Sequence, residues 1–591
     1  MTALTCATSP ELLGTSSVAF QPYSNLLVSY NPQQNQVSIS NPVTRERTAF
    51  VCNLGAAPPP PPTPPAATCI PNPANTVQQA QYLAQTVLKG TGTSSVTVSA
   101  AGSSTTLTLF GGLAVDPATN QAFVVQSGSG QIWIINLGPT PTTVLKTAQI
   151  TELQVPTVPG ALVGGIAGAL MPQGTLTSTN NLSNVQIFGS GFDSSTEVRL
   201  DGVALPSGNV NYVSGRVLNV TIPASFLSAP HRYAVSVLNG SGVQSNATDL
   251  FVIKAVDMTT ACSGGSPQPS SVAIADQLPG QGFSPIAVVS NSGCGNISVI
   301  DVNPTSATFG SVKSTIATGT NPQGVAVSPR FGIAVVANNT DGTASVINLL
   351  NGTQAVAAVT VGATPTGVAI NEDTGATLVA NTGSNTVSEI DLSLLFGSSP
   401  ATSLSATSIG VDQSPIAVAI DPDRGTNNQG LAVVTALQLV SGAAPSGILD
   451  TIDIGLATPA KSTSASVGNV IATPTGVVFD PSVSPRLFYA TSSGGNVVTS
   501  FNPDTGLTSS VHVGINPTSL ALNPQTGGIM TTNSASQTVS IIDTTANPFT
   551  TRSTFGLGGS PQFAVAIDQF TNLAVVADQA NNRVLIFPLP N

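Results

Sequence analysis

One phrase recurs along most of this chain, and it limits the possible folds more than any other feature of the sequence. Val368–Asp391 reads VAINEDTGATLVANTGSNTVSEID, and Leu520–Asp543 repeats the pattern as LALNPQTGGIMTTNSASQTVSIID. Each copy holds three short runs of β-branched or alternating apolar residues, separated by turns rich in Gly, Asn and Asp. Such runs and turns predict antiparallel strands that are joined by hairpins.

The period of this phrase predicts how the strands assemble. Prolines ahead of successive copies, such as Pro322 and Pro365, lie about 40–50 residues apart, which is typical of a β-propeller blade of three or four strands. A single small sheet cannot bury both of its faces, whereas a ring of blades can, and a ring also protects the strand edges. Further copies begin at Ser17, Gly112, Ser271, Gly324, Ala417, Gly476 and Ala564.

The number of copies predicts the number of blades. Two copies precede residue 150 and seven follow it, so the nominal expectation is nine blades, or seven or eight if a degenerate copy forms no blade. The last copy stops after its third strand, and the chain begins with a spare apolar stretch at Thr2–Pro10. We therefore expect Thr2–Ala7 to pair beside Arg583–Phe587 and to close a single ring.

The residues of the repeat resemble those of a known family. The stretches VVANN, LVANTGSNTVSEID and NPTSLALNPQTG are similar to the YVTN-type β-propeller repeat of bacterial surface proteins, which is related to NHL-type propellers. The resemblance covers most of Pro267–Asn591 and returns in two N-terminal patches. It implies an extracytoplasmic binding or surface-layer role and carries no common catalytic residues.

The repeat is interrupted between about residues 151 and 255. Asn184–Ile253 resembles an IPT/TIG domain, a small immunoglobulin-like sandwich, through IFGSGF, VRLDGV and LNVTIPASF. We expect N-terminal blades at 1–155 with a Pro-rich insertion at 56–70, a linker and the immunoglobulin-like domain at 156–254, and the remaining blades at 255–591. Because the insertion carries its own strands and Pro/Gly-rich flanks, we expect an excised Asn180–Lys254 fragment to fold alone.

Composition excludes several classes of partner. Charged residues are only 7% of the chain and the net charge is −11, so no basic patch exists to neutralise the phosphates of nucleic acid. The longest apolar run, Ala161–Met171, is shorter than the roughly 20 residues that a transmembrane helix needs. The surface is rich in Thr, Asn and Ser and poor in Lys, which favours an extracellular or cell-surface protein, although no export signal is visible in this chain.

The five cysteines leave two interpretations open. Cys52–Cys69 and Cys262–Cys294 are plausible disulfide pairs in an oxidising compartment, with Cys6 left over. The alternative is that all five are reduced, small buried residues. No pair has the spacing of a zinc site.

A search for catalytic chemistry finds little. The two histidines, His231 and His512, fall in different predicted domains. Four acids follow the first strand of a copy and are best explained as turn initiators, whose carboxylates bond the backbone ahead: Asp116, Asp421, Asp480 and Asp568. Asp421 and Asp423 in DPDRGTNN are the candidate metal ligands, with Ca²⁺ as the ion, but the loop lacks the full calcium-loop spacing. No catalytic or cofactor-binding residue is predicted.

Two functions from different classes remain. The first is a secreted or cell-surface binding or scaffold protein without catalytic activity, whose partner is a protein or a glycan. The alternative is a lactonase-like propeller hydrolase or lyase with a metal in the central channel. Three or more Asp, Glu, Asn or His side chains converging at one channel mouth would favour the enzyme.

Overall fold

The computed structural model describes the strands between residues 17 and 154 and most of residues 173–590. Within the second stretch, the positions outside the description are 241, 263–264, 427–428, 439–445, 457, 467–472, 546–548 and 557–563. The described elements are strands and 3-10 turns of three or four residues, which confirms the predicted all-β class. The chain divides into two compact units: Met1–Gln149 with Ser190–Asp193 and Asn239–Gln244, and the remaining residues.

The N-terminal unit contains two four-stranded antiparallel sheets and one hairpin. The two copies of the phrase predicted here form β1–β3 and β8–β10, and β4 and β5 each add a fourth strand. Thr2–Ala7, the Pro-rich segment at 56–70 and Cys6, Cys52 and Cys69 lie outside the described residues. The strands are β1 (Ser17–Gln21), β2 (Leu26–Asn31), β3 (Gln36–Asn41), β4 (Glu46–Val51), β5 (Gln85–Lys89), β6 (Ser95–Ala100), β7 (Ser103–Thr108), β8 (Gly112–Asp116), β9 (Gln121–Gln126) and β10 (Gln131–Asn136).

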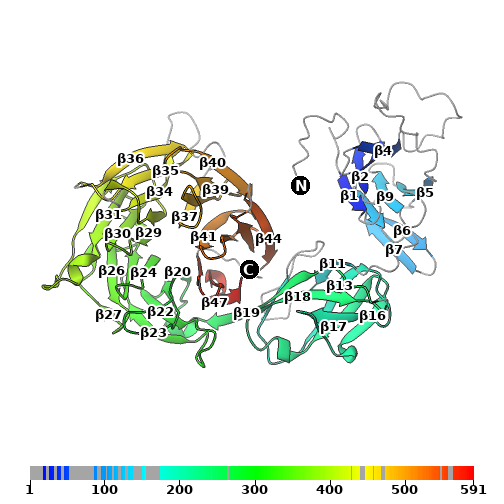
Figure 1. Ribbon diagram of the computed structural model, residues 1–591, viewed down its shortest axis with the longest axis horizontal. Helices are drawn as coiled ribbons and strands as arrows, with labels where there is room; N and C mark the ends of the chain where they lie inside the picture. Colours follow the sequence, from blue (N-terminus) through cyan, green and yellow to red (C-terminus); the bar gives the residue numbers. More distant parts are fainter. Residues whose placement is uncertain are drawn as a thin grey trace, which may run out of the picture. The chain divides into compact units, whose positions relative to one another are not determined.

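A β-sandwich precedes the main run of repeats (Figure 1). Its sheets run in the orders β11-β13-β17-β16 and β15-β14-β18-β19, and β12 pairs in parallel with β19. Alternate residues of β17 are buried, as expected when each sheet turns one apolar face toward the other. The strands are β11 (Gln149–Gln154), β12 (Gln173–Leu176), β13 (Leu182–Ser190), β14 (Glu197–Leu200), β15 (Val203–Ala204), β16 (Val210–Ser214), β17 (Val217–Ile222), β18 (His231–Leu238) and β19 (Thr248–Asp257).

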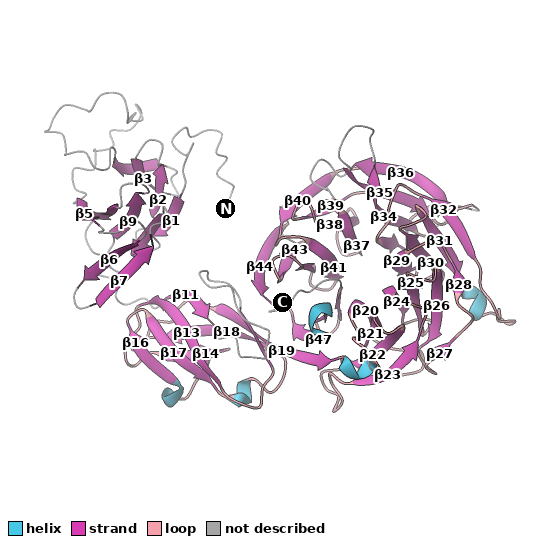
Figure 2. Ribbon diagram, turned by 180° about the vertical axis from the view of Figure 1, so that it is seen from behind, coloured by secondary structure: helices cyan, strands magenta, loops and turns pink. Residues whose placement is uncertain are grey.

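Seven sheets of four or five strands follow one another around a ring in the residues from 248 onward (Figures 1 and 2). We number the strands of each sheet outward from the ring's centre. The first three sheets are β20 (Pro269–Ala275), β21 (Ile286–Asn291), β22 (Asn296–Asp301) and β23 (Val312–Ala317); β24 (Pro322–Ser328), β25 (Ile333–Asn338), β26 (Thr343–Asn348), β27 (Thr353–Gln354) and β28 (Val359–Thr360); and β29 (Pro365–Ile370), β30 (Ala376–Asn381), β31 (Thr386–Asp391) and β32 (Ala406–Gly410).

The remaining four sheets complete the ring. They are β33 (Val418–Asp421), β34 (Leu431–Gln438), β35 (Ser446–Asp453) and β36 (Ala460–Ser466); β37 (Pro474–Asp480), β38 (Leu487–Ser492), β39 (Val497–Phe501) and β40 (Thr508–His512); β41 (Pro517–Asn523), β42 (Gly528–Asn533), β43 (Thr538–Asp543) and β44 (Thr550–Gly556); and β45 (Val565–Ile567), β46 (Leu573–Asp578) and β47 (Arg583–Pro588) with β19. The first and seventh sheets share one apolar core, in which Val272 and Ala287 pack with Val575 and Ile586.

The strand that closes the seventh sheet is β19. Its second half, Lys254–Asp257, pairs antiparallel with Ile586–Arg583, so it occupies the edge of β47. The prediction that Thr2–Ala7 pairs there is therefore wrong. The described residues from 248 onward hold seven repeat sheets, and the two N-terminal copies form sheets of the other unit, so the predicted number of blades stays a prediction.

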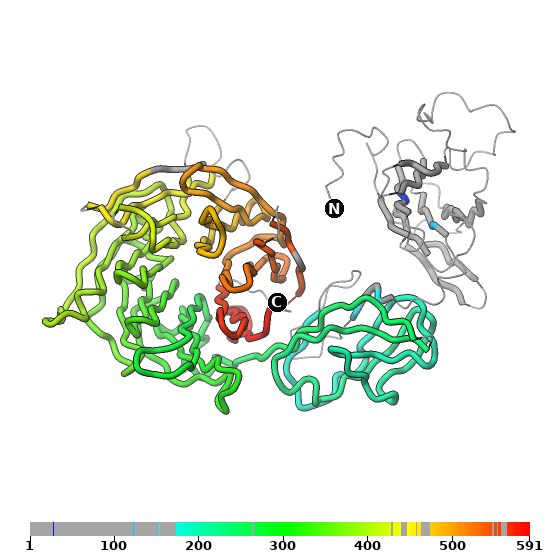
Figure 3. Tube along the Cα trace, viewed as in Figure 1, coloured from blue at the N-terminus to red at the C-terminus, as the bar shows by residue number. Residues whose placement is uncertain are grey.

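The first half of β19 belongs to the sandwich, where Thr248–Val252 pair with β18. One continuous strand thus connects the sandwich to the ring, as the tube in Figure 3 shows. Phe251 is fully buried in the ring's core, stacked on Phe555 at 4.4 Å between ring centroids and edge-on to Phe587 at 6.1 Å.

These contacts correct the predicted domain boundaries. The boundary at 254/255 falls inside β19, and the sandwich begins with β11 at Gln149 rather than at residue 156. A fragment that ends at Lys254 would expose Phe251 to water, because its packing partners Phe555 and Phe587 belong to the ring. The structure therefore argues against independent folding of Asn180–Lys254.

A buried amide network explains why the phrase returns with the same polar residues. Asn381 ends β30, and its Nδ2 donates to Thr386 Oγ1 at 3.1 Å and to Ser388 Oγ at 3.0 Å on β31. The same bonds join Asn338 to Thr343 and Ser345, and Asn533 to Thr538 and Ser540. Because a buried amide without partners destabilises a protein, the Asn and its hydroxyl partners must recur together.

In the seventh sheet an ion pair replaces this amide network. Asp578 stands where the second, third and sixth sheets have Asn, and Arg583 stands where those three sheets have Thr. Arg583 Nε donates to Asp578 Oδ2 at 2.7 Å, and both side chains are buried.

A glycine recurs beside the amide network because no side chain fits there. A Cβ at Gly362 would lie 2.6 Å from Asn381 Cβ, and one at Gly514 would lie 2.7 Å from Asn533 Cγ. The residue before the opening proline also adopts a left-handed conformation in five of the described sheets, a conformation that Asn tolerates better than most other residues. These residues are Gln268, Asn321, Thr364, Ser414 and Asn516.

Candidate functional site

The ring has two faces, which the strand connections define. Neighbouring first strands run in the same direction, since Ser270 near the start of β20 donates to Pro322 O at the start of β24, at 2.8 Å. All connections from first to second and from third to fourth strands therefore lie on one face, which we call the odd-turn face. The other connections form the even-turn face.

Exposed large apolar side chains gather on the odd-turn face. Among the described residues from 255 onward, eight such side chains are exposed, and seven of them stand in first-to-second or third-to-fourth connections. The exception is Ile515, in the connection between the fifth and sixth sheets. The seven are Phe283, Leu350, Leu394, Phe396, Leu456, Leu507 and Phe570.

The largest group on this face lies at the second and third sheets. Phe396 stacks on Phe331 at 5.0 Å between centroids, while 47% of its surface stays exposed. Leu394 belongs to the 3-10 turn η7 (Leu392–Leu395) just before it and is 51% exposed. Arg330 lies over the Phe331 ring at 5.4 Å, so a cation flanks the apolar group.

A second aromatic group lies where the seventh sheet meets the first. Phe283 and Phe570 contact edge to face at 5.9 Å, and 64% of Phe570 is exposed. Both side chains come from first-to-second connections, so two sheets that are far apart in sequence build this group together.

The even-turn face presents hydroxyl and amide groups, and several of its described polar side chains join neighbouring sheets. Thr366 Oγ1 donates to Ile416 O at 2.9 Å, and Thr475 Oγ1 donates to Pro517 O at 3.0 Å. Asn339 Nδ2 donates to Pro365 O at 3.1 Å. These groups are therefore occupied in holding the ring together.

The two candidate metal ligands face arginines. Asp421 is buried at the end of β33, and its Oδ1 accepts from Arg486 Nη1 at 2.7 Å. Asp423 Oδ2 accepts from Arg486 Nη2 at 2.6 Å, and Arg424 lies 3.6 Å from Asp421 Oδ2. Burial raises the pKa of Asp421, and the charge of Arg486 opposes this rise. The geometry is that of an ion-pair network between the fourth and fifth sheets.

The recurrent acids initiate turns, as the sequence predicts. Asp480 Oδ1 accepts from Ser482 N at 2.9 Å, Asp568 Oδ1 accepts from Phe570 N at 2.9 Å, and Asp421 Oδ1 accepts from Asp423 N at 3.2 Å. The side chain of Asp116 lies outside the described set.

The histidines do not build a catalytic site. His231 Nε2 lies 2.7 Å from Asp201 Oδ2 on the sandwich, whereas His512 ends β40 in the ring. Within the described part of the chain, no three His, Cys, Asp or Glu side chains converge as metal ligands.

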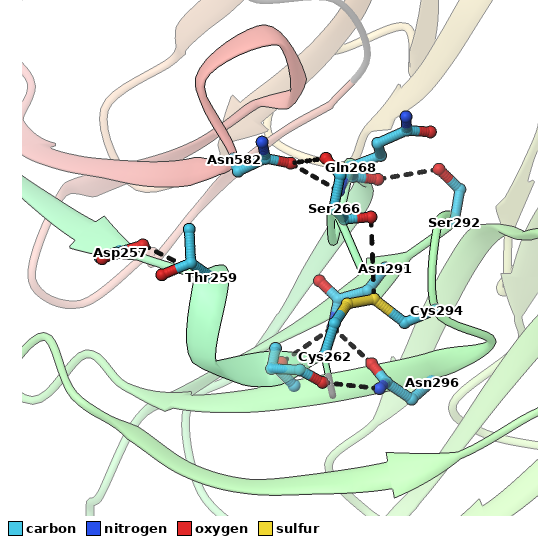
Figure 4. The surroundings of a disulfide bond; sticks show 12 residues. Asp257, Thr259, Cys262, Ser266, Gln268, Asn291, Ser292, Cys294, Asn296 and Asn582 are labelled. Carbon is cyan, nitrogen blue, oxygen red and sulfur yellow. Dashed lines mark hydrogen bonds between the residues drawn. A yellow bond between two sulfur atoms is a disulfide. The ribbon is translucent and has the colours of Figure 1, made fainter. Parts of the chain in front are cut away.

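The structure brings Cys262 and Cys294 together as a disulfide-bonded pair with a Cα–Cα distance of 5.8 Å (Figure 4). The pair ties the segment after β19 to the second turn of the first sheet. Asn582 Oδ1 of the seventh sheet accepts from Ser266 Oγ at 2.6 Å and from Gln268 N at 3.0 Å. This part of the even-turn face therefore fastens the end of the ring to its beginning.

The sequence did not single out the odd-turn face. Its signal is present as large apolar residues inside turns, in LSLLFG (Leu392–Gly397) and DQFTN (Asp568–Asn572), where turns otherwise carry polar residues.

The fold and this face define an all-β protein in which a propeller-like ring of repeat sheets carries a β-sandwich. No protein-family model and no curated protein matches the chain. Among solved structures it is similar to hydrazine synthase from Kuenenia stuttgartiensis, with 17% identity and a TM-score of 0.45, over 56% of this chain and 97% of that chain. A likeness at this level does not extend to activity. In the described part of the chain, no helix has the length and apolar character needed to cross a membrane.

Proposed function

We propose that this protein is a non-catalytic binding or scaffold protein that presents the odd-turn face of its ring to a protein partner. The observation that carries the proposal is the distribution of exposed large apolar side chains: of the eight among the described residues from 255 onward, seven lie on one face. Exposed apolar groups rimmed by polar residues mark protein interaction sites, and Phe and Arg are enriched in them.

A protein partner fits this face better than a glycan. The exposed groups are Phe and Leu, without the hydroxyl or indole N–H with which Tyr and Trp bond polar ligands. The even-turn face carries the hydroxyl and amide groups that a glycan could use, but several of them bond the next sheet.

The finer identity rests on the resemblance of the residues. We propose a YVTN/NHL-type bacterial repeat protein with an IPT/TIG-type sandwich, located outside the cell or on its surface. The Cys262–Cys294 pair supports this location, because structural disulfides persist in oxidising compartments.

The alternative, a propeller hydrolase or lyase with a central metal, has one observation in its favour. Buried carboxylates stand at or just after the ends of three first strands, at Asp421, Asp480 and Asp568. Each of them initiates a turn, however, and Asp421 also pairs with an arginine. This arrangement favours the binding protein.

The test is a binding screen of the purified protein against panels of surface proteins and glycans, using matched variants. Phe396→Ser and Phe570→Ser should each weaken binding of a protein partner by about 1 kcal/mol or more, whereas Ile515→Ser, equally apolar but on the opposite face, should not. Binding that only Ile515→Ser weakens would contradict the proposal. Metal-dependent turnover of a lactone that Asp421→Asn abolishes would establish the alternative.

A further inference from the structure

The acidic residues of the ring gather on the odd-turn face. Among the described residues from 255 onward, twelve Asp and Glu residues stand in odd-turn connections or at the strand ends that lead into them. Four stand at the corresponding places of the even-turn face, and two of these four are paired: Asp412 with Lys461 at 2.9 Å, and Asp578 with Arg583 at 2.7 Å. The face that holds most of the exposed large apolar side chains is therefore also the acidic face.

The odd-turn face has few cations of its own to neutralise these acids. Its described connections hold three arginines, and each of them already faces an acid of the same face. Arg330 Nη1 lies 3.7 Å from Asp373 Oδ1. Asp421 lies 3.6 Å from Arg424 and accepts from Arg486 at 2.7 Å. An excess of negative charge is therefore left on this face for a partner to meet.

Exposed leucines alternate with acids in three successive sheets of the ring. In the third-to-fourth connections of the third, fourth and fifth sheets, an exposed Leu stands three residues after an Asp. Because these sheets follow one another around the ring (Figure 1), the six residues form one row of carboxylate and apolar groups, which we call the acid–leucine row. Its members are Asp391 and Leu394, Asp453 and Leu456, and Asp504 and Leu507.

Hydrogen bonds within the turns hold two carboxylates of the acid–leucine row in place. Asp391 Oδ1 accepts from Ser393 N at 2.9 Å, and Asp453 Oδ1 accepts from Gly455 N at 3.0 Å. Burial raises the pKa of Asp453, but hydrogen bonds from Thr426 and Gly455 outweigh this effect and lower the pKa below its usual value. Asp453 is therefore ionised at neutral pH, at a fixed position beside Leu456.

The chemistry of this face selects one kind of occupant. Carboxylates next to exposed leucines complement Lys or Arg side chains that stand next to large apolar ones, and opposite charge steers such surfaces together. A second copy of this chain is a poor match, because the chain holds 15 Lys and Arg against 26 Asp and Glu and its odd-turn face would bring like charges together. Nucleic acids and anionic membrane surfaces carry negative charge and would be repelled as well.

We propose that the odd-turn face binds a cationic protein, whose Lys or Arg side chains meet the acids of the acid–leucine row and whose apolar side chains cover its leucines and Phe396. This inference rests on the proposed function and adds the chemical class of the partner. Since 47% of Phe396, 51% of Leu394 and 70% of Leu507 are exposed, the apolar part of the contact is available without rearrangement of the ring.

The test is calorimetric titration of the full chain with three synthetic peptides: a Lys/Leu peptide, a Glu/Leu peptide with the same apolar positions, and a Lys/Ser peptide with the same charges. We expect the Lys/Leu peptide to bind most tightly, and its Kd to rise at least about tenfold between about 10 and 150 mM NaCl, because salt screens exposed charges.

Matched double variants locate the effect on the face. Asp391→Asn with Asp504→Asn should raise the Kd of the Lys/Leu peptide about 3–10-fold at low salt, since two exposed acids of the acid–leucine row lose their charge. Asp257→Asn with Asp341→Asn is the control and should leave the Kd unchanged, because it removes two exposed acids from the even-turn face. Asn keeps an oxygen that can accept the turn's hydrogen bond in each case.

Three results would overturn the inference: no binding of the Lys/Leu peptide at low salt, equal binding of the Glu/Leu peptide, or equal weakening by the two double variants. Phe396→Ser separates this inference from the proposed function. If Phe396→Ser weakens the binding of a protein partner while Asp391→Asn with Asp504→Asn does not, the apolar face stands and the cationic partner is refuted. If neither change affects binding, both proposals fail.

Discussion

Replacing Phe251 should reveal how firmly the sandwich and the ring are joined. Phe251 is fully buried, stacks on Phe555 at 4.4 Å and meets Phe587 edge-on, so Phe251→Ala removes one member of a three-ring cluster. The loss combines the transfer free energy of a buried Phe, about 1.5–3 kcal/mol, with the cost of the cavity that remains. We expect the free energy of unfolding to fall by about 3–5 kcal/mol.

The assay is urea denaturation followed by far-UV circular dichroism. Phe570→Ala is the matched control, because 64% of that side chain is exposed and its removal should change the stability by about 0.5 kcal/mol or less. A loss for Phe251→Ala as small as that of the control would refute the joint core.

Three further predictions concern the repeat and the ring closure, and each is measured by denaturation of the full chain. Gly362→Ala should lower the free energy of unfolding by about 1–3 kcal/mol, because its Cβ would overlap the buried amide network. Gly397→Ala is the control and should leave the stability unchanged, because no atom lies within 4 Å of its Cβ position. Equal effects of the two variants would argue against the steric explanation. Asp578→Asn should lower the free energy of unfolding by about 3–5 kcal/mol, because it leaves Arg583 buried and unpaired. Adding Arg583→Thr should recover part of that loss, because it recreates the amide–hydroxyl pair of the second, third and sixth sheets. A double variant no more stable than the single variant would contradict this. Cys294→Ala should lower the free energy of unfolding by about 4 kcal/mol, by the loop-entropy model for a sequence separation of 32. Peptide mapping without reduction should recover the Cys262–Cys294 link in exported protein. A free Cys294 thiol in that protein would disprove the disulfide.

The sequence predicts the strands well because each copy repeats the same pattern of apolar strand residues and polar turn residues. Local patterns alone predict where the strands of the ring begin and end. These patterns are the period-2 runs, the Asn at the end of the second strand and the Gly/Asn turns. The copies at Ser17 and Gly112 also form strands, as predicted. Local patterns do not tell which sheets share a ring, however, so the number of copies does not fix the number of blades.

The closure could not be predicted because β19 serves two sheets. Its residues Leu250–Ile253 are all buried, since the sandwich covers one part of the strand and the ring covers the other. In sequence this run is indistinguishable from the last strand of a self-contained sandwich. The aromatic group of the candidate site was missed for a related reason, because Phe283 and Phe570 are about 290 residues apart in sequence and only the closed ring brings them together.

Hydrogen exchange at β47 tests the central claim, that β19 closes the ring. Val256 pairs with Val584, and a proline there removes a backbone donor and blocks strand pairing. In Val256→Pro the amides of Arg583–Phe587 that bond β19 should exchange much faster than in the native chain, whereas Thr5→Pro should leave them protected. Fast exchange at β47 in Thr5→Pro, with protection kept in Val256→Pro, would contradict the account and restore closure by the N-terminal strand.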